Sequence, residues 1–201
     1  MSAQERSGTG PGRPRDPDMD ARILDAALRV YAARGKAGFS IDVVAKAAGC
    51  SRPAVYARWP TRTELLLAAV RSFDSSLDVA DTGPVRDQLV AVASHFMDGF
   101  SNVHGMATFR IVLDSLDDHE LLGEWEKINE ARLRSARDVI GRGIERGELP
   151  AELSAPEFFR SLFGAAMLQG IYDHLGMSES SGSTRAHADR LVDFLLGTQH
   201  R

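Results

Sequence analysis

Residues 41–59 constrain this chain most, because they require two short helices joined by a tight turn. Val44, Ala45 and Ala48 recur at helical spacing and give the first helix one apolar face. Ala45 is small enough to let a second helix cross close to that face. Gly49 follows the last apolar position, where a left-handed backbone commonly ends a helix. The segment therefore predicts a helix that ends at a glycine turn.

A second helix is predicted directly after this turn. Ser51 is a suitable N-cap, because its hydroxyl accepts a hydrogen bond from a free amide of the first turn. Pro53 lies in that turn, where its missing N–H leaves no hydrogen bond unmade. Two helices joined by about three or four residues with a glycine in the turn form the helix-turn-helix pattern, whose second helix enters the DNA major groove by its N-terminal residues. In this chain those residues are Arg52, Pro53 and Ala54.

The charge of the chain is distributed unevenly. The net charge is −4, which alone argues weakly against a nucleic-acid partner. Residues 1–62, however, hold 11 Arg or Lys and 6 Asp or Glu, whereas residues 63–201 hold 13 and 22. A basic N-terminal module on an acidic body confines the attraction for phosphate to one end of the protein.

Composition also limits where the protein acts. The sequence has no run of 18 apolar residues and no secretory signal, so we expect a cytoplasmic protein that does not enter a membrane. The single cysteine, Cys50, excludes an internal disulfide framework and a cysteine-based zinc site. Two interpretations of Cys50 remain: a small, partly buried residue of the turn, or a redox sensor.

A search for catalytic motifs argues against an enzyme. The sequence contains neither a phosphate-binding P-loop nor a Gly-x-Ser-x-Gly elbow, and His119-Glu120 lacks the second histidine of a zinc protease. Gly141, Gly143 and Gly147 have the wrong spacing for a dinucleotide fingerprint and follow no predicted strand. We therefore expect no catalysis, no cofactor and no metal site.

The periodicity of apolar residues predicts an all-α fold of about nine helices, since no segment alternates with period two. We expect three parts: a flexible arm over residues 1–17, a helix-turn-helix DNA-binding domain over 18–62, and a helical body for dimerisation and ligand binding over 63–201. Arg13 and Arg15 of the arm either reach a DNA minor groove or belong to a solvated tail. The helix after Thr61 is expected to carry one apolar stripe, formed by Leu66, Ala69, Val70, Phe73 and Leu77.

The body offers apolar residues for an effector cavity, each of which is equally a candidate for ordinary core packing. The candidate lining residues are Phe96, Phe100, Phe109, Leu113, Trp125, Phe163 and Met167. The effector expected from such a lining is a small apolar molecule. Ligand cavities between helices are commonly lined by apolar and aromatic side chains of this kind.

The segment from Ala155 to about Leu175 is apolar nearly all round, so one buried face does not account for it. Either it forms the centre of a large core, or part of it packs on a second subunit. Because a last helix with its own leucines follows it, we favour a helical dimer interface. The residues assigned to this interface are Phe159, Leu162, Ala166, Leu191 and Leu195.

Several motifs of the N-terminal region occur together and in a specific order. They are Arg22-Ile-Leu-Asp-Ala-Ala-Leu28, Tyr31-Ala-Ala-Arg34-Gly35, Ser40-Ile41-Asp, Ala45-x-x-Ala48-Gly49-x-Ser51, Tyr56-x-x-Trp59 and Arg62-x-Glu64-Leu65-Leu66. Over about 45 residues this order resembles the TetR family of bacterial transcriptional regulators. The stretch from Arg134 to Pro150, which ends in Arg146-Gly147-Glu148-Leu149-Pro150, is also similar to a C-terminal type found in that family.

The resemblance implies roles for individual residues. Ser40 and Ser51 match positions that bind phosphate, and both also serve as helix caps without DNA. Arg52, Pro53 and Ala54 match the base-reading start of the recognition helix, where an arginine can hold a guanine through two hydrogen bonds.

The resemblance also covers the residues that follow the recognition helix. Tyr56 matches a tyrosine that meets the DNA backbone, and Arg62 matches a basic residue that holds phosphate at the start of the fourth helix. Arg58 would reach either a base or a phosphate. Trp59 departs from the usual Phe or Val, and it either packs in the module or donates its indole N–H to a phosphate.

The resulting prediction is a homodimeric repressor that binds double-stranded DNA at a pseudo-palindromic operator. Its recognition helices would lie about 34 to 36 Å apart, one helical turn of DNA. A small-molecule effector in the body would change this spacing through the helix that begins at Arg62. Two alternatives remain: a regulator of this fold that activates or ignores ligands, and a helical interaction protein that does not bind DNA.

Overall fold

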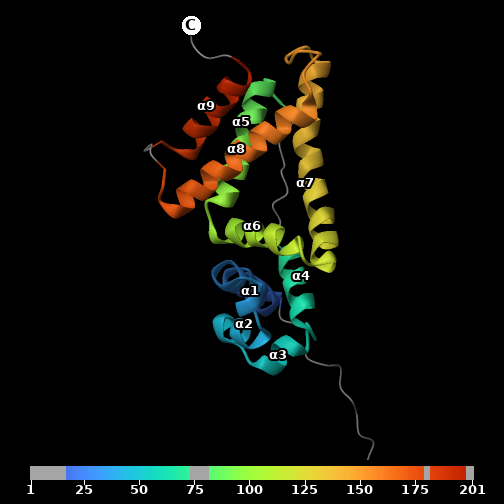
Figure 1. Cartoon of the computed structure of the whole chain (residues 1–201), viewed down its shortest axis with the longest axis vertical. Helices are drawn as coiled ribbons and strands as arrows, with labels where there is room; N and C mark the ends of the chain where they lie inside the picture. The colour runs from blue at the N-terminus through green and yellow to red at the C-terminus, as the bar shows by residue number, and fades with distance from the viewer. Residues whose placement is uncertain (1–16, 73–81, 179–181, 198–201) are drawn as a thin grey trace, which may run out of the picture.

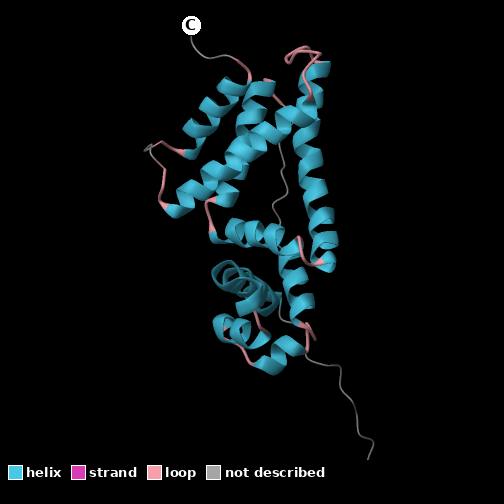
Figure 2. Ribbon diagram, in the orientation of Figure 1, coloured by secondary structure: helices cyan, strands magenta, loops and turns pink. Residues whose placement is uncertain are grey.

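The computed structural model describes residues 17–72, 82–178 and 182–197, which contain nine helices and no strand (Figure 2). The helices are α1 (Pro17–Gly38), α2 (Ile41–Ala48), α3 (Arg52–Tyr56), α4 (Arg62–Ser72), α5 (Val85–Phe100), α6 (Val103–Ser115), α7 (His119–Glu145), α8 (Ala155–Leu175) and α9 (Thr184–Leu195). The prediction of an all-α fold is confirmed. The arm up to residue 16, with Arg13 and Arg15, lies outside the described residues, as do Phe73 and Leu77. No helix in the described part combines the length and the apolar composition that crossing a bilayer needs.

Helices α1 to α4 form one end of the molecule (Figure 1). Helix α1 packs against α2 and α4, and its Ile23, Ala27 and Tyr31 are buried. Their core also contains Val44 of α2 and Val55 of α3. We call this group the N-terminal core. It leaves one side of the short helix α3 free for other contacts.

Helix α5 is the centre of the other end, where it packs against α7, α8 and α9 (Figure 1). A Cβ atom on Gly170 would lie 2.4 Å from the carbonyl oxygen of Met97, so α8 crosses α5 at a distance that only glycine allows. Arg86 of α5 also binds two carboxylates of α9, Asp189 at 3.2 Å and Asp193 at 2.7 Å. Close packing of α8 on α5 and ion pairs between α5 and α9 therefore hold these helices together.

Helix α6 joins the two ends, because it packs against both α1 and α7 (Figure 1). Ala107 and Ile111 of α6, together with Leu121 of α7, are buried in the N-terminal core. Helix α4 contributes Leu65 and Leu66 to the same core. The module that carries α3 is thus continuous with the start of the body.

The predicted dimer residues are placed differently from the sequence expectation. Phe159, Leu162 and Ala166 are buried in the core of the single chain, because α8 lies directly on α5. Leu191 and Leu195 are half-buried against the same core. Other apolar side chains of α8 and α9 are exposed instead, among them Leu168, Tyr172, Leu175 and Phe194.

Candidate nucleic-acid interface

The turn between α2 and α3 has the geometry that its sequence predicts. The Ser40 hydroxyl caps α2 by accepting from the Val43 amide at 3.3 Å. Gly49 ends α2 with a left-handed backbone, φ 66° and ψ 35°. The Ser51 hydroxyl then caps α3 by accepting from the Ala54 amide at 3.3 Å. These local bonds hold α3 at a defined angle to α2.

The two sides of α3 differ sharply in exposure. Val55 is completely buried in the N-terminal core, whereas Pro53 is exposed and Tyr56 is 49% exposed. The Arg52 side chain is 67% exposed and forms an ion pair with Asp42 at 3.1 Å. Exposed pairs of this kind contribute only about 0.2 to 1 kcal/mol, so Arg52 can leave Asp42 for an acceptor on DNA. Val55 therefore holds α3 on the N-terminal core, whereas Arg52 and Pro53 at its start are exposed.

Arg58 is held inside the module. Its guanidinium binds the carboxylate of Asp20 in α1, and Nη1 donates to the Ala54 carbonyl at 3.0 Å. Only 16% of the side chain is exposed. Arg58 therefore fastens the end of α3 to α1, and any DNA contact would compete with these bonds. Trp59 is half-buried and packs against the N-terminal core, which is one of its two predicted roles.

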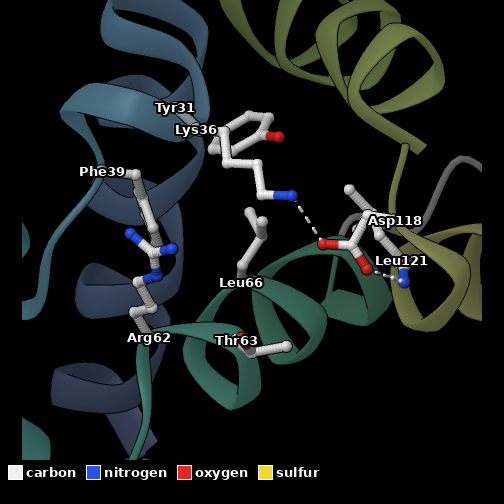
Figure 3. Close-up of a pocket in the computed structure, with 8 residues that line it drawn as sticks. All are labelled: Tyr31, Lys36, Phe39, Arg62, Thr63, Leu66, Asp118 and Leu121. Carbon is white, nitrogen blue, oxygen red and sulfur yellow. Dashed lines mark hydrogen bonds and ion pairs between the residues drawn. The ribbon is translucent and has the colours of Figure 1, made fainter. Parts of the chain in front are cut away.

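Arg62 stands at the first position of α4, and its side chain is exposed. Thr61 caps this helix by accepting from the Glu64 amide at 3.1 Å. Within the described residues, the Arg62 guanidinium has no hydrogen-bond or ion-pair partner. Figure 3 shows the side chain reaching from α4 toward Phe39. This leaves its charge available for a phosphate or another anion.

The body brings together some of the aromatic residues proposed for an effector cavity. Phe163 of α8 lies edge-on to Phe96, with ring centroids 4.8 Å apart, and to Phe100 at 6.0 Å. Phe159 stacks on Phe163 at 5.7 Å. We call these four residues the phenylalanine cluster. The other proposed lining residues are half-buried (Phe109 and Met167), 49% exposed (Leu113), or packed on the N-terminal core (Trp125).

Polar contacts that the sequence did not reveal join α1 to α6 and to the turn before α7. Tyr31 donates to Asp114, Lys36 binds Asp118 at 2.9 Å, and His104 contacts Asp25 at 2.8 Å. The residues of each contact lie 79 to 83 positions apart, so no local pattern indicates them. These contacts fasten the N-terminal end of the molecule to the helix that leads into the body.

Two of these contacts change proton affinities. Burial raises the pKa of the Tyr31 hydroxyl well above its usual value, and the hydrogen bond to Asp114 raises it further. The hydrogen bond from Lys36, followed by that from the Leu121 amide, lowers the pKa of Asp118 below its ordinary 3.8. Tyr31 therefore stays protonated and Asp118 stays ionised across the physiological range.

Asp118→Ala is expected to lower the free energy of unfolding by about 1 to 2 kcal/mol at pH 7, because it removes both the N-cap of α7 and the partner of Lys36. Since the pKa of Asp118 is lowered on folding, this stabilisation is complete above pH 3.8 and is lost as the pH falls through the folded-state pKa. Urea denaturation at several pH values from 7 to 3 measures the difference. A difference from wild type that stays constant below pH 3.8 would contradict the assignment.

Family profiles match both ends of this structure. The profile of the bacterial regulatory proteins of the tetR family matches residues 23–69, which hold α2, α3 and most of α1 and α4. The profile of the tetracyclin repressor-like C-terminal domain matches residues 79–195, more than half of the chain. The chain belongs to the TetR family. It is accordingly a DNA-binding transcriptional regulator, and the helix-turn-helix prediction is confirmed.

Individual TetR-family regulators resemble this one along most of its length. The transcriptional regulator AqdR of Rhodococcus erythropolis is 29% identical over 157 residues, which cover 77% of this chain and 74% of AqdR. The crystal structure of MexZ, a repressor responsible for antibiotic resistance in Pseudomonas aeruginosa, has a TM-score of 0.71 and 26% identity, and the match covers 91% of this chain and 95% of MexZ.

A more distant structure shows the shared fold alone. FadR from Bacillus subtilis, solved in complex with stearoyl-CoA, has a TM-score of 0.69 and 18% identity. The match covers 90% of this chain and 99% of FadR. The arrangement of a helix-turn-helix module on a helical body is thus common to this regulator and to both structures.

Proposed function

We propose that this TetR-family regulator is a ligand-responsive repressor, and that its homodimer binds a pseudo-palindromic operator in the cytoplasm. The observation that carries the proposal is the start of α3. There Arg52 and Pro53 are exposed, while Val55 anchors the helix in the N-terminal core. A rigid, exposed helix start of this kind suits insertion into the major groove. Its position at the end of the molecule opposite α9 leaves the body free to dimerise (Figure 1).

The contacts proposed with DNA follow from this exposure. Arg52 reads a base, with Pro53 and Ala54 beside it in the groove. Ser40, Ser51, Tyr56 and Arg62 hold phosphates on either side of it. Arg58 supports α3 through Asp20, and Trp59 supports it from the core. The phosphate contacts set the register of the protein, and Arg52 supplies the sequence preference.

The proposed effector site is the region of the phenylalanine cluster. A small apolar molecule there would lie against Phe96, Phe100 and Phe163, and Met167 follows Phe163 on the next turn of α8. The related fold of FadR was solved with the acyl-chain compound stearoyl-CoA, which supports an apolar effector class. Because coupling is reciprocal, an effector that weakens DNA binding must itself bind more weakly to the DNA complex, by the same factor.

Two arginine variants test the DNA assignment. Arg62→Ala should weaken binding to every sequence and lower the slope of log affinity against log salt by about two, one for each subunit. Arg52→Ala should instead reduce the preference for the operator over unrelated DNA by about 1 to 3 kcal/mol per contacted base. Fluorescence anisotropy over a range of salt concentrations measures both quantities.

Arg160→Ala is the matched control, because Arg160 is an exposed arginine of α8 paired with Glu157 on the same helix. It should leave both the affinity and the salt slope unchanged. The operator itself is found by selecting bound fragments from genomic DNA. Absence of DNA binding by the wild-type protein at low salt would refute the proposal, and operator binding that no ligand alters would favour a constitutive regulator instead.

A further inference from the structure

A second candidate site lies outside the phenylalanine cluster, at the junction of the module and the body. It is a pocket of about 170 Å³ between the end of α1, the start of α4 and the turn from α6 to α7. Its lining residues are Tyr31, Lys36, Phe39, Arg62, Thr63, Leu66, Asp118 and Leu121 (Figure 3). The contacts proposed with an effector in the body do not use this pocket.

The pocket is lined by both apolar and charged side chains. Tyr31, Phe39, Leu66 and Leu121 are each at most 7% exposed and present carbon surface to the space. Such walls favour an aromatic or aliphatic group over water. The polar side chains that border them come from all three surrounding elements. A ligand that fills the space would therefore need one apolar part and one polar part.

The charges of the lining favour an anion. Asp118 is already compensated, because it accepts from Lys36 at 2.9 Å and from the Leu121 amide at 3.1 Å. Arg62 has no such partner within the described residues. The lining thus has two cations and one anion, and the charge of Arg62 is unused. A guanidinium binds a carboxylate through two parallel hydrogen bonds, which is the strongest pairing that this side chain forms.

The volume limits the size of the ligand. An enclosed, engineered protein cavity of about 150 Å³ holds one benzene molecule, so this pocket of about 170 Å³, which is partly open to solvent, has room for a single ring with one small substituent. We propose that this pocket binds a single-ring aromatic carboxylate. The ring lies among the apolar side chains of the lining, and the carboxylate pairs with Arg62.

Binding at this place has a direct consequence for DNA, which rests on the proposed function. The same Arg62 that pairs with the carboxylate is the residue assigned to a phosphate. One guanidinium cannot satisfy both anions at once, so ligand and DNA compete. The ligand also contacts α1, α4 and the turn before α7 together, so it links the module to the body. Saturating ligand should weaken operator binding about 10-fold or more.

The first experiment measures binding without DNA. Isothermal titration of the full-length protein with sodium benzoate, at ionic strength kept constant with NaCl, should give saturable binding. Benzamide has the same ring without the charge and should bind at least 10-fold more weakly. Arg62→Gln should also weaken benzoate binding at least 10-fold, because it removes the cation and keeps a polar side chain.

A second variant fills the pocket without changing its charge. Thr63→Phe places a ring in the space that the ligand would occupy and should abolish benzoate binding. Arg134→Gln is the control, since Arg134 is an exposed arginine of α7 paired with Glu130 on the same helix. It should bind benzoate like wild type. Thermal unfolding of all variants confirms that they are folded.

The outcomes separate this inference from the proposed function. No benzoate binding to the wild type, or equal binding to wild type, Arg62→Gln and Thr63→Phe, overturns the junction site. Benzoate that binds without changing operator affinity supports the site and overturns the competition. If the protein binds benzoate as expected but no DNA at low salt, the site stands and the proposed function fails.

Discussion

A protein with both Leu168→Glu and Phe194→Glu is expected to be a monomer whose operator affinity is at least about 100-fold lower than that of wild type. Leu168 is 48% exposed on α8, and Phe194 is 64% exposed on the adjacent α9. Large apolar side chains exposed on two neighbouring helices are typical of a protein interface. Charges there would have to be buried without partners when a second subunit packs on them.

The loss of operator affinity follows from bivalency. Two linked modules bind two half-sites with an avidity about 10² to 10⁴ times that of one module. Sedimentation equilibrium gives the oligomeric state, and fluorescence anisotropy gives the affinity. Leu116→Glu is the matched control, because Leu116 is 75% exposed at the end of α6, away from α8 and α9 in the chain. A double variant that remains dimeric would show that the interface lies elsewhere.

Gly105→Ala is expected to lower the free energy of unfolding by about 3 kcal/mol. A Cβ atom on Gly105 would lie 1.9 Å from the carbonyl oxygen of Gly99 and 2.6 Å from the Cα of Phe100. Both atoms belong to the backbone of α5, so no side chain can move aside. The two helices would have to separate, and the orientation of α6 would change with them. Because α6 packs against α1, a change in its orientation would shift the helices that contact DNA, so operator binding should weaken as well.

Gly141→Ala is the control for Gly105→Ala. It also lies inside a helix, α7, but a Cβ atom there would meet nothing within 4 Å. Alanine should therefore stabilise the protein by about 0.4 to 1 kcal/mol, through its better helix propensity. Urea denaturation of the two variants measures the contrast. Similar free energies for both would show that α5 and α6 do not pack as closely as the structure places them.

The structural features that the sequence predicted depend on residues that lie close to one another in the chain. Gly49 and Ser51 bond to groups within a few positions, so the end of α2 and the start of α3 followed from residue type and spacing alone. The apolar residues of the chain recur at helical spacing, and this periodicity indicated the all-α fold for the same reason.

Contacts between distant residues did not follow from any pattern. Asp20 and Arg58 lie 38 positions apart, so no local pattern indicated that an arginine expected on DNA also links α1 to α3. Nothing local indicates that Tyr31 meets Asp114, or that Lys36 meets Asp118. The junction pocket is lined by residues that lie far apart in the sequence, so no local motif predicted it.

Helix α8 shows the limit of periodicity most clearly. Its sequence is apolar nearly all round, so it contains no signal for which face packs inward. The sequence by itself determined the all-α fold, the turn at Gly49 and the residues that begin α3, because those properties arise from local hydrogen bonds and helical spacing. The resemblance of its motifs to the TetR family indicated a regulator. Only the tertiary structure decided that Phe159 and Leu162 belong to the core while Leu168 is exposed, because the close crossing at Gly170 sets how α8 lies on α5.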